Sequence, residues 1–169
     1  MQAREIRRPP GPLCLFQARS RPFAVDLEVV DGVVELDGLV AIPLCPPEVL
    51  GLSTYHREVV PVVRIEAPGF ENDEVIEGKL VALILKGRQG SWGLRIDRDN
   101  VAVVDAPAEV LVETPLEPAW PTISGRWERG GTSFEILDPE RSWRGLRDRI
   151  EHWYRIAGGR GPLPNAGER

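Results

Sequence analysis

The chain has 169 residues, of which 42% are hydrophobic and 28% charged, and these proportions suit one globular domain or two small lobes sharing a core. Its formal net charge of −5 argues against a nucleic-acid binder, because phosphate contacts need clustered Lys and Arg. No apolar run is long enough to span a bilayer, and the Arg- and Pro-rich start lacks the apolar segment of a signal peptide. These features predict a cytoplasmic protein without membrane insertion.

The two ends of the chain are predicted to be flexible and irregular. Residues 1–12 end in a Pro-Pro-Gly-Pro sequence, and residues 158–169 start with two glycines and contain two prolines. The ordered domain is therefore expected over residues 13–157.

Short β-type runs alternate with turn signals in the first half of this domain. Runs at 13–18 and 23–30 are separated by a polar turn, a short run at 39–42 stops at a proline, and 59–65 is strongly β-branched. Residues 46–51 start with proline and end with glycine, which predicts one helical turn.

Two hairpins are predicted in the second half. The first joins 79–85 to 91–96 across a Lys-Gly-Arg-Gln-Gly sequence, and the second joins 122–128 to 132–137 around two glycines. A further strand is expected at 101–104, and the Pro-rich residues between it and the second hairpin are expected to form a loop. Strands at this regular spacing predict a mainly β fold of small barrels or a sandwich.

One long helix is predicted at about 139–157. Asp138 is suited to cap its N-terminus, and Pro139 to its first position. Five apolar residues recur at helical spacing and are expected to pack against the barrel: Trp143, Leu146, Ile150, Trp153 and Ile156.

The sequence lacks the spacings that catalytic, metal or cofactor sites need. His56 and His152 are far apart, and Cys14 and Cys45 form no CxxC motif and are predicted to be buried free thiols. There is no nucleophile elbow and no phosphate-binding loop. We therefore expect no catalytic site, cofactor or metal. A small hydrolase that pairs Ser53 with His56 stays open as an alternative, because triad members need only meet in space.

The residues from Ile42 to Ile65 carry the most specific pattern. The spacing P-x2-P-x4-G, followed by a polar turn and then V-V-P-V-V, resembles the CheW-like family of bacterial chemotaxis scaffold domains. Four other segments resemble family elements and come in the family's order, and they are 23–27, 93–97, 123–125 and 136–138. The resemblance covers residues 13–142.

This resemblance implies two small SH3-like five-stranded β-barrels that share a core, followed by the C-terminal helix. It also implies a non-catalytic adaptor that bridges the regulatory domain of a CheA-type histidine kinase and the cytoplasmic tips of methyl-accepting chemoreceptors. A binding module in a non-chemotactic histidine-kinase pathway is the alternative within the same class.

The chain departs from the family in the turn before the V-V-P run. The family has Asn-x-Arg-Gly there, and this chain has Thr54, Tyr55, His56 and Arg57. If the family glycine has positive φ, Arg57 would cost about 1 kcal/mol or force another turn. His56 replaces a permanent cation with a group that is only partly charged near neutral pH.

The resemblance places ten residues at partner-contact positions, namely Val30, Gly32, Val33, Gly51, Leu52, Thr54, His56, Arg57, Arg64 and Ala102. A basic edge of His56, Arg57 and Arg64 would favour an acidic partner patch. The alternatives are a core role for Val30, Val33 and Leu52, and a plain solvated turn for His56 and Arg57.

Overall fold

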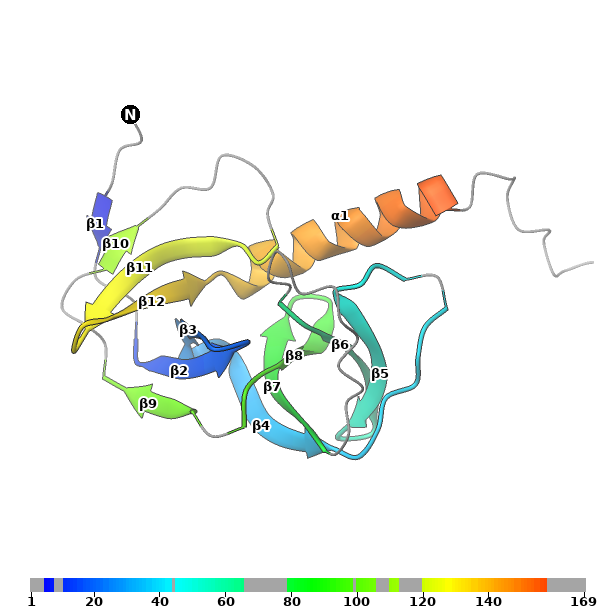
Figure 1. The fold of residues 1–169 in the computed structure, drawn as a ribbon, viewed down its shortest axis with the longest axis horizontal. Coiled ribbons are helices and arrows are strands. Elements are labelled where there is room, and N and C mark those ends of the chain that lie inside the picture. The colour runs from blue at the N-terminus through cyan, green and yellow to red at the C-terminus, as the bar shows by residue number, and fades with distance from the viewer. Residues whose placement is uncertain are drawn as a thin grey trace, which may run out of the picture.

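The computed structural model describes residues 5–7, 11–43, 45–65, 79–98, 100–105, 110–112 and 120–157. They form a mainly β fold with a C-terminal α-helix, as predicted (Figure 1). The first elements are β1 (Glu5–Arg7), β2 (Leu13–Ala18), β3 (Arg21–Asp26), the 3-10 turn Leu27–Val29, β4 (Val30–Leu36), β5 (Val49–Tyr55) and β6 (Glu58–Val63). They are followed by β7 (Leu80–Gly87), β8 (Gly90–Arg95), β9 (Ala102–Val104), β10 (Val110–Val112), β11 (Ile123–Arg129), β12 (Thr132–Leu137) and α1 (Pro139–Ala157).

The strands form two sheets. Sheet A has seven strands in the order β1-β10-β11-β12-β3-β2-β9, and sheet B has five in the order β4-β7-β8-β6-β5. Each sheet contains one parallel pair, β12 with β3 in sheet A and β6 with β8 in sheet B. Each sheet therefore joins strands that are distant in the sequence.

Sheet A has two strands more than the predicted five. The prediction of an irregular leader is wrong at residues 5–7, which form β1, and β10 at 110–112 lies in the segment predicted to be a loop. Both strands are three residues long and depend on long-range pairing, β1 with β10 and β10 with β11. Local sequence patterns carry no signal for such pairing. The predicted tail at 158–169 lies outside the described residues.

The two predicted hairpins are confirmed as β7–β8 and β11–β12. The helical turn predicted at 46–51 is wrong, because β5 already begins at Val49. The strand predicted at 39–42 is reduced to one bridge, in which Val40 pairs with Leu52.

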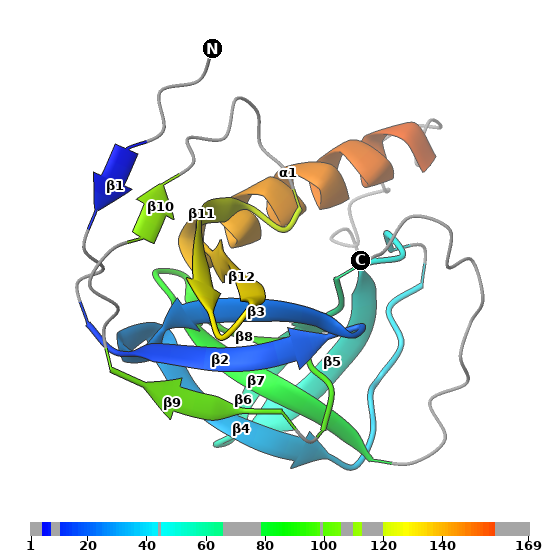
Figure 2. The same ribbon diagram turned by 60° about the vertical axis from the view of Figure 1, so that its left-hand side comes forward.

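One core is shared by the two sheets and α1. Trp92 of β8 is fully buried in it, and its ring lies 5.6 Å from that of Trp143 on α1 and 6.0 Å from that of Trp120. Phe16 and Phe23 enter from sheet A, and Leu83 and Leu94 from sheet B, among others. In Figure 1, α1 begins beside β12 and ends above β5, and Figure 2 shows it along the same end of both sheets. The helix therefore covers the seam between the sheets.

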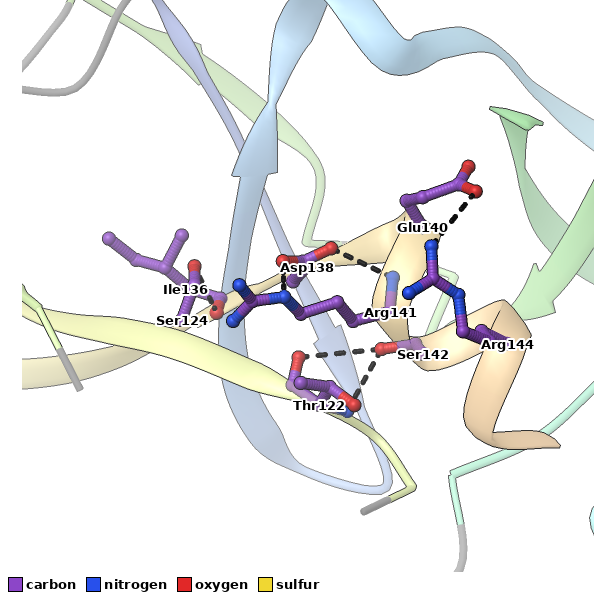
Figure 3. Close-up of polar contacts among 8 residues, drawn as sticks. All are labelled: Thr122, Ser124, Ile136, Asp138, Glu140, Arg141, Ser142 and Arg144. Carbon is purple, nitrogen blue, oxygen red and sulfur yellow. Dashed lines mark hydrogen bonds and ion pairs between the residues drawn. The ribbon is translucent and has the colours of Figure 1, made fainter. Parts of the chain in front are cut away.

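The start of α1 is held by side chains that satisfy backbone groups (Figure 3). The Asp138 carboxylate accepts a hydrogen bond from the Arg141 N–H at 2.9 Å, which confirms the predicted cap. The buried Ser142 hydroxyl accepts from the Thr122 N–H at 2.9 Å and donates to the Thr122 carbonyl at 3.4 Å. These bonds tie the first turn of α1 to the residue before β11.

A second polar contact joins the sheets at the end of β8. The Asp97 carboxylate accepts from the backbone N–H groups of Arg19 and Ser20, at 3.1 and 2.8 Å, and its own N–H donates to the Gln17 carbonyl at 2.7 Å. Arg19 and Ser20 form the β2–β3 turn with φ of 53° and 60°. Asp97 therefore stabilises a strained turn of sheet A from the end of a sheet B strand.

We predict that Asp97→Ala lowers the free energy of unfolding by about 1–3 kcal/mol, because two backbone donors lose their acceptor. Asp37→Ala is the matched control, since Asp37 is an exposed aspartate that only approaches Lys79 at 3.7 Å, and it should cost less than about 0.5 kcal/mol. Urea denaturation measures both. Equal losses would show that the Asp97 contacts add nothing.

Candidate partner-binding surface

The β5–β6 hairpin presents the turn in which this chain departs from the family pattern. Tyr55 pairs with Glu58, so His56 and Arg57 are the two turn residues. Their φ angles are 48° and 71°, which is typical of type I′ turns, where glycine and asparagine are usual. The positive φ considered for Arg57 is thus observed, and the hairpin keeps this geometry without a glycine.

Tyr55 links this turn to β4 across sheet B. Its ring stacks on His56, with centroids 4.0 Å apart and planes 15° apart. Desolvation raises the pKa of the Tyr55 hydroxyl, and the Asp31 carboxylate, its hydrogen-bond partner, raises it further. A Cβ on Gly32 would lie 3.2 Å from the Tyr55 hydroxyl oxygen, so Gly32 leaves room for that ring. Sequence reasoning missed Tyr55, although an aromatic residue beside a turn and an Asp-Gly pair on another strand were visible signals.

The predicted apolar contact residues differ in exposure. Val33 on β4 is 43% exposed, and Val59 on β6, which the sequence analysis did not select, is 67% exposed. Val59 pairs with the exposed Thr54. Val30 and Leu52 are half-buried, and Val30 packs against the shared core. A pure core role is therefore excluded for Val33 and fits Val30 better than a contact role does.

Gly51 has a structural role in this hairpin. It is buried, its φ is 149°, and a Cβ there would lie 2.6 Å from the Val40 carbonyl oxygen. The bridge between Val40 and Leu52 requires this close approach. Gly51 thus allows the β5 strand to approach Val40, and this buried glycine presents no side chain to a partner.

Arg64 does not lie beside His56 and Arg57. It follows the far end of β6, about 23 Å along the strand from Arg57. Its backbone N–H donates to the Glu48 carbonyl at 2.8 Å and its Nε to the Pro47 carbonyl at 2.9 Å. The predicted three-residue basic edge is therefore wrong, because the hairpin separates its members.

Ala102 lies on the other sheet. It is exposed on β9, the edge strand of sheet A, next to Val103, which is 60% exposed. The predicted contact residues therefore fall into three separate regions. One is the β5–β6 hairpin together with β4, the second is Arg64 after the end of β6, and the third is the β9 edge strand.

The geometry argues against the hydrolase alternative. His56 is exposed on a hairpin turn, and the Ser53 hydroxyl donates to the Gly38 carbonyl at 3.3 Å. Within the described residues no group of histidine, cysteine and carboxylate side chains could hold a metal. Cys14 and Cys45 are free, Cys14 is buried with its thiol pKa raised by desolvation, and Cys45 is half-buried.

Comparison with known proteins decides the family. The family model for the CheW-like domain matches residues 12–144. The chain belongs to the CheW-like domain family. No curated protein matches it. Its structure is similar to the crystal structure of the scaffolding protein TtCheW from Thermoanaerobacter tengcongensis, with a TM-score of 0.60 and 15% identity over 78% of this chain and 91% of that one.

The resemblance stated from the sequence is thus confirmed, and so is the CheW fold of two SH3-like barrels, here built on sheets A and B. The family is one of scaffold and adaptor domains for chemotaxis signalling. Among the described residues, no helix is long and apolar enough to cross a membrane.

We predict that Gly51→Ala destabilises the fold by about 2 kcal/mol or more, because a methyl group would overlap the Val40 carbonyl at a strained φ. Gly38→Ala is the control, since no atom lies within 4 Å of a Cβ there, and it should shift stability by less than about 0.5 kcal/mol. Thermal unfolding compares the two. An unchanged melting temperature for Gly51→Ala would contradict the steric argument.

We predict that Arg57→Gly stabilises the chain by about 0.5–1 kcal/mol, because glycine adopts positive φ without steric cost. Arg57→Ala removes the same charge but keeps a Cβ, so it should bring no gain. Denaturant titration of both variants separates the two causes. Equal stabilisation by both would assign the effect to charge instead of backbone strain.

Proposed function

We propose that this chain is a non-catalytic, cytoplasmic adaptor that bridges the regulatory domain of a CheA-type histidine kinase and the cytoplasmic tips of chemoreceptors. The observation that carries the proposal, beside family membership, is the presence of exposed apolar side chains on both sheets. Val33 and Val59 lie on sheet B, and Ala102 and Val103 on the β9 edge of sheet A. An adaptor needs two such surfaces so that both partners bind at once.

The proposed mechanism is mass action between surfaces. Apolar patches supply affinity, and the hairpin turn supplies specificity. His56 and Arg57 project from the turn and would favour a carboxylate-bearing patch on the partner, through charge-assisted hydrogen bonds. Arg64 is not part of this proposed contact, because its Nε is bonded at the other end of β6. No cofactor, metal or bound nucleic acid takes part.

A non-chemotactic histidine-kinase pathway is the second candidate. It is favoured by the turn, which keeps positive φ at two residues while the side chains differ from the family's Asn-x-Arg-Gly. Different side chains on an exposed turn are what a change of partner would need.

Binding of the purified chain to the host's kinase regulatory domains and receptor tips, measured by calorimetry, tests the adaptor proposal. We predict that Val33→Glu weakens one interaction by about tenfold or more and Val103→Glu the other, because each buries a charge in one interface only. Circular dichroism controls for folding. If neither partner binds the folded wild-type chain, the proposal fails.

A second test exchanges the turn. The triple change Thr54→Asn, His56→Arg and Arg57→Gly should let the chain bind a kinase–receptor pair that standard family members use, if the turn sets specificity. The matched control is Arg57→Gly alone, which relieves strain without restoring the other two side chains. Unchanged binding by the triple variant would assign the turn to a solvated role.

A further inference from the structure

The apolar face of α1 is longer than the body it covers. Trp143 and Leu146 pack in the shared core as predicted, and Ile150 is half-buried against it. Trp153 is 43% exposed and Ile156 68% exposed, so the prediction that they pack on the barrel is wrong in large part. Figure 1 shows the second half of α1 running above the cyan segment that precedes β5.

A groove of about 560 Å³ lies between these two segments. Its volume is within the range of about 300–1,000 Å³ that is usual for ligand-binding sites. Three residues before β5 face six of the helix: Pro46, Pro47 and Glu48 on one side, and Gly145, Asp148, Arg149, His152, Trp153 and Ile156 on the other. The walls are thus mainly apolar, with charge concentrated at Glu48 and its neighbours.

Glu48 is the unusual residue of this groove. It is only 1% exposed, and its Oε1 forms an ion pair with the Arg149 guanidinium. Its Oε2 is buried and has no hydrogen-bond donor among the residues that the structure describes. A buried carboxylate oxygen without a donor costs free energy, and a bound N–H group would recover it.

Two residues outside the lining, Arg64 and Tyr154, bind the segment before β5. Arg64 fixes the segment before β5 through the Pro47 and Glu48 carbonyls, at 2.9 and 2.8 Å. On the helix side, the Tyr154 hydroxyl donates to the Pro43 carbonyl, with the two oxygens 3.5 Å apart. A site whose walls are already fixed loses little conformational entropy when it binds.

We propose that this groove docks a short segment of a partner protein in which a lysine or arginine is flanked by apolar residues. The cationic group donates to Glu48 Oε2, which is covered in this structure and is reached when the exposed Arg149 side chain moves aside. The apolar neighbours cover Trp153 and Ile156. The lining carries the carboxylates of Glu48 and Asp148 beside Arg149 and His152, and Asp148 also approaches the Arg147 guanidinium at 3.6 Å. The preference for a cation therefore rests on the unbonded Oε2 of Glu48. The site is separate from the hairpin turn and from the β9 edge, so it adds a third contact to the adaptor and does not depend on the proposed partners.

Selection of random peptides displayed on phage, with the whole chain as target, supplies the probe. We expect the enriched peptides to carry Lys or Arg between apolar residues. Fluorescence anisotropy of a labelled enriched peptide should show about fivefold or greater weakening by Ile156→Ser, through loss of apolar contact. Val40→Ser, at a valine that is 71% exposed and outside the proposed contact surfaces, is the matched control and should leave the affinity unchanged.

The role of Glu48 is tested by a double-mutant cycle. Replacing the peptide's lysine by norleucine should weaken binding to the wild-type chain by about tenfold, and this difference should shrink to about twofold or less on Glu48→Gln. Indole N–H resonances of the wild-type chain locate the site even if Glu48→Gln fails to fold, because Trp153 should shift on peptide binding and Trp127 should not.

Several results would overturn the proposal. These are enrichment of no peptide, enrichment of peptides without a cation, equal weakening by Val40→Ser and Ile156→Ser, or a lysine preference that survives in folded Glu48→Gln. Loss of kinase or receptor binding would bear on the adaptor function alone, since neither protein is used in this experiment.

Discussion

The shared core around Trp92 is the constraint on which the rest of the molecule depends. This side chain is fully buried where sheet A, sheet B and α1 meet, and it packs between Trp120 and Trp143. Because protein interiors are close-packed, the two sheets cannot move independently without opening this core. The hairpin surface on one sheet and the β9 edge on the other are therefore held in a fixed relation, which is what a protein that positions two partners requires.

Polar contacts refine this arrangement at the rim of the core. Asp97 fastens a turn of sheet A to the end of β8, and Ser142 fastens α1 to the residue before β11. Glu48 and Arg64 do the same for the segment before β5, and Arg64 also accepts the Trp120 indole N–H at 3.1 Å through its carbonyl. Arg64 thus connects the segment that forms one wall of the groove to Trp120, which packs against the shared core.

The β5–β6 turn holds two residues other than glycine at positive φ. The φ angles of His56 and Arg57 are typical of a type I′ turn, and they carry steric strain that glycine would avoid. Tyr55 compensates in part, since it stacks on His56 and bonds to Asp31 across the sheet. A strained but supported turn is consistent with selection for its side chains instead of its stability.

The sequence by itself determined the elements that local patterns encode. Both hairpins, the extent of α1 and its Asp138 cap followed from periodicity and turn chemistry, and the motifs around Ile42–Ile65 identified the family. Only the tertiary structure decided the rest. Strands β1 and β10 depend on long-range pairing, Arg64 is separated from His56 by the length of β6, and Trp153 is exposed because α1 extends past the body that buries Trp143. Periodicity says which face of a helix is apolar, but only the neighbouring elements decide how much of that face is covered.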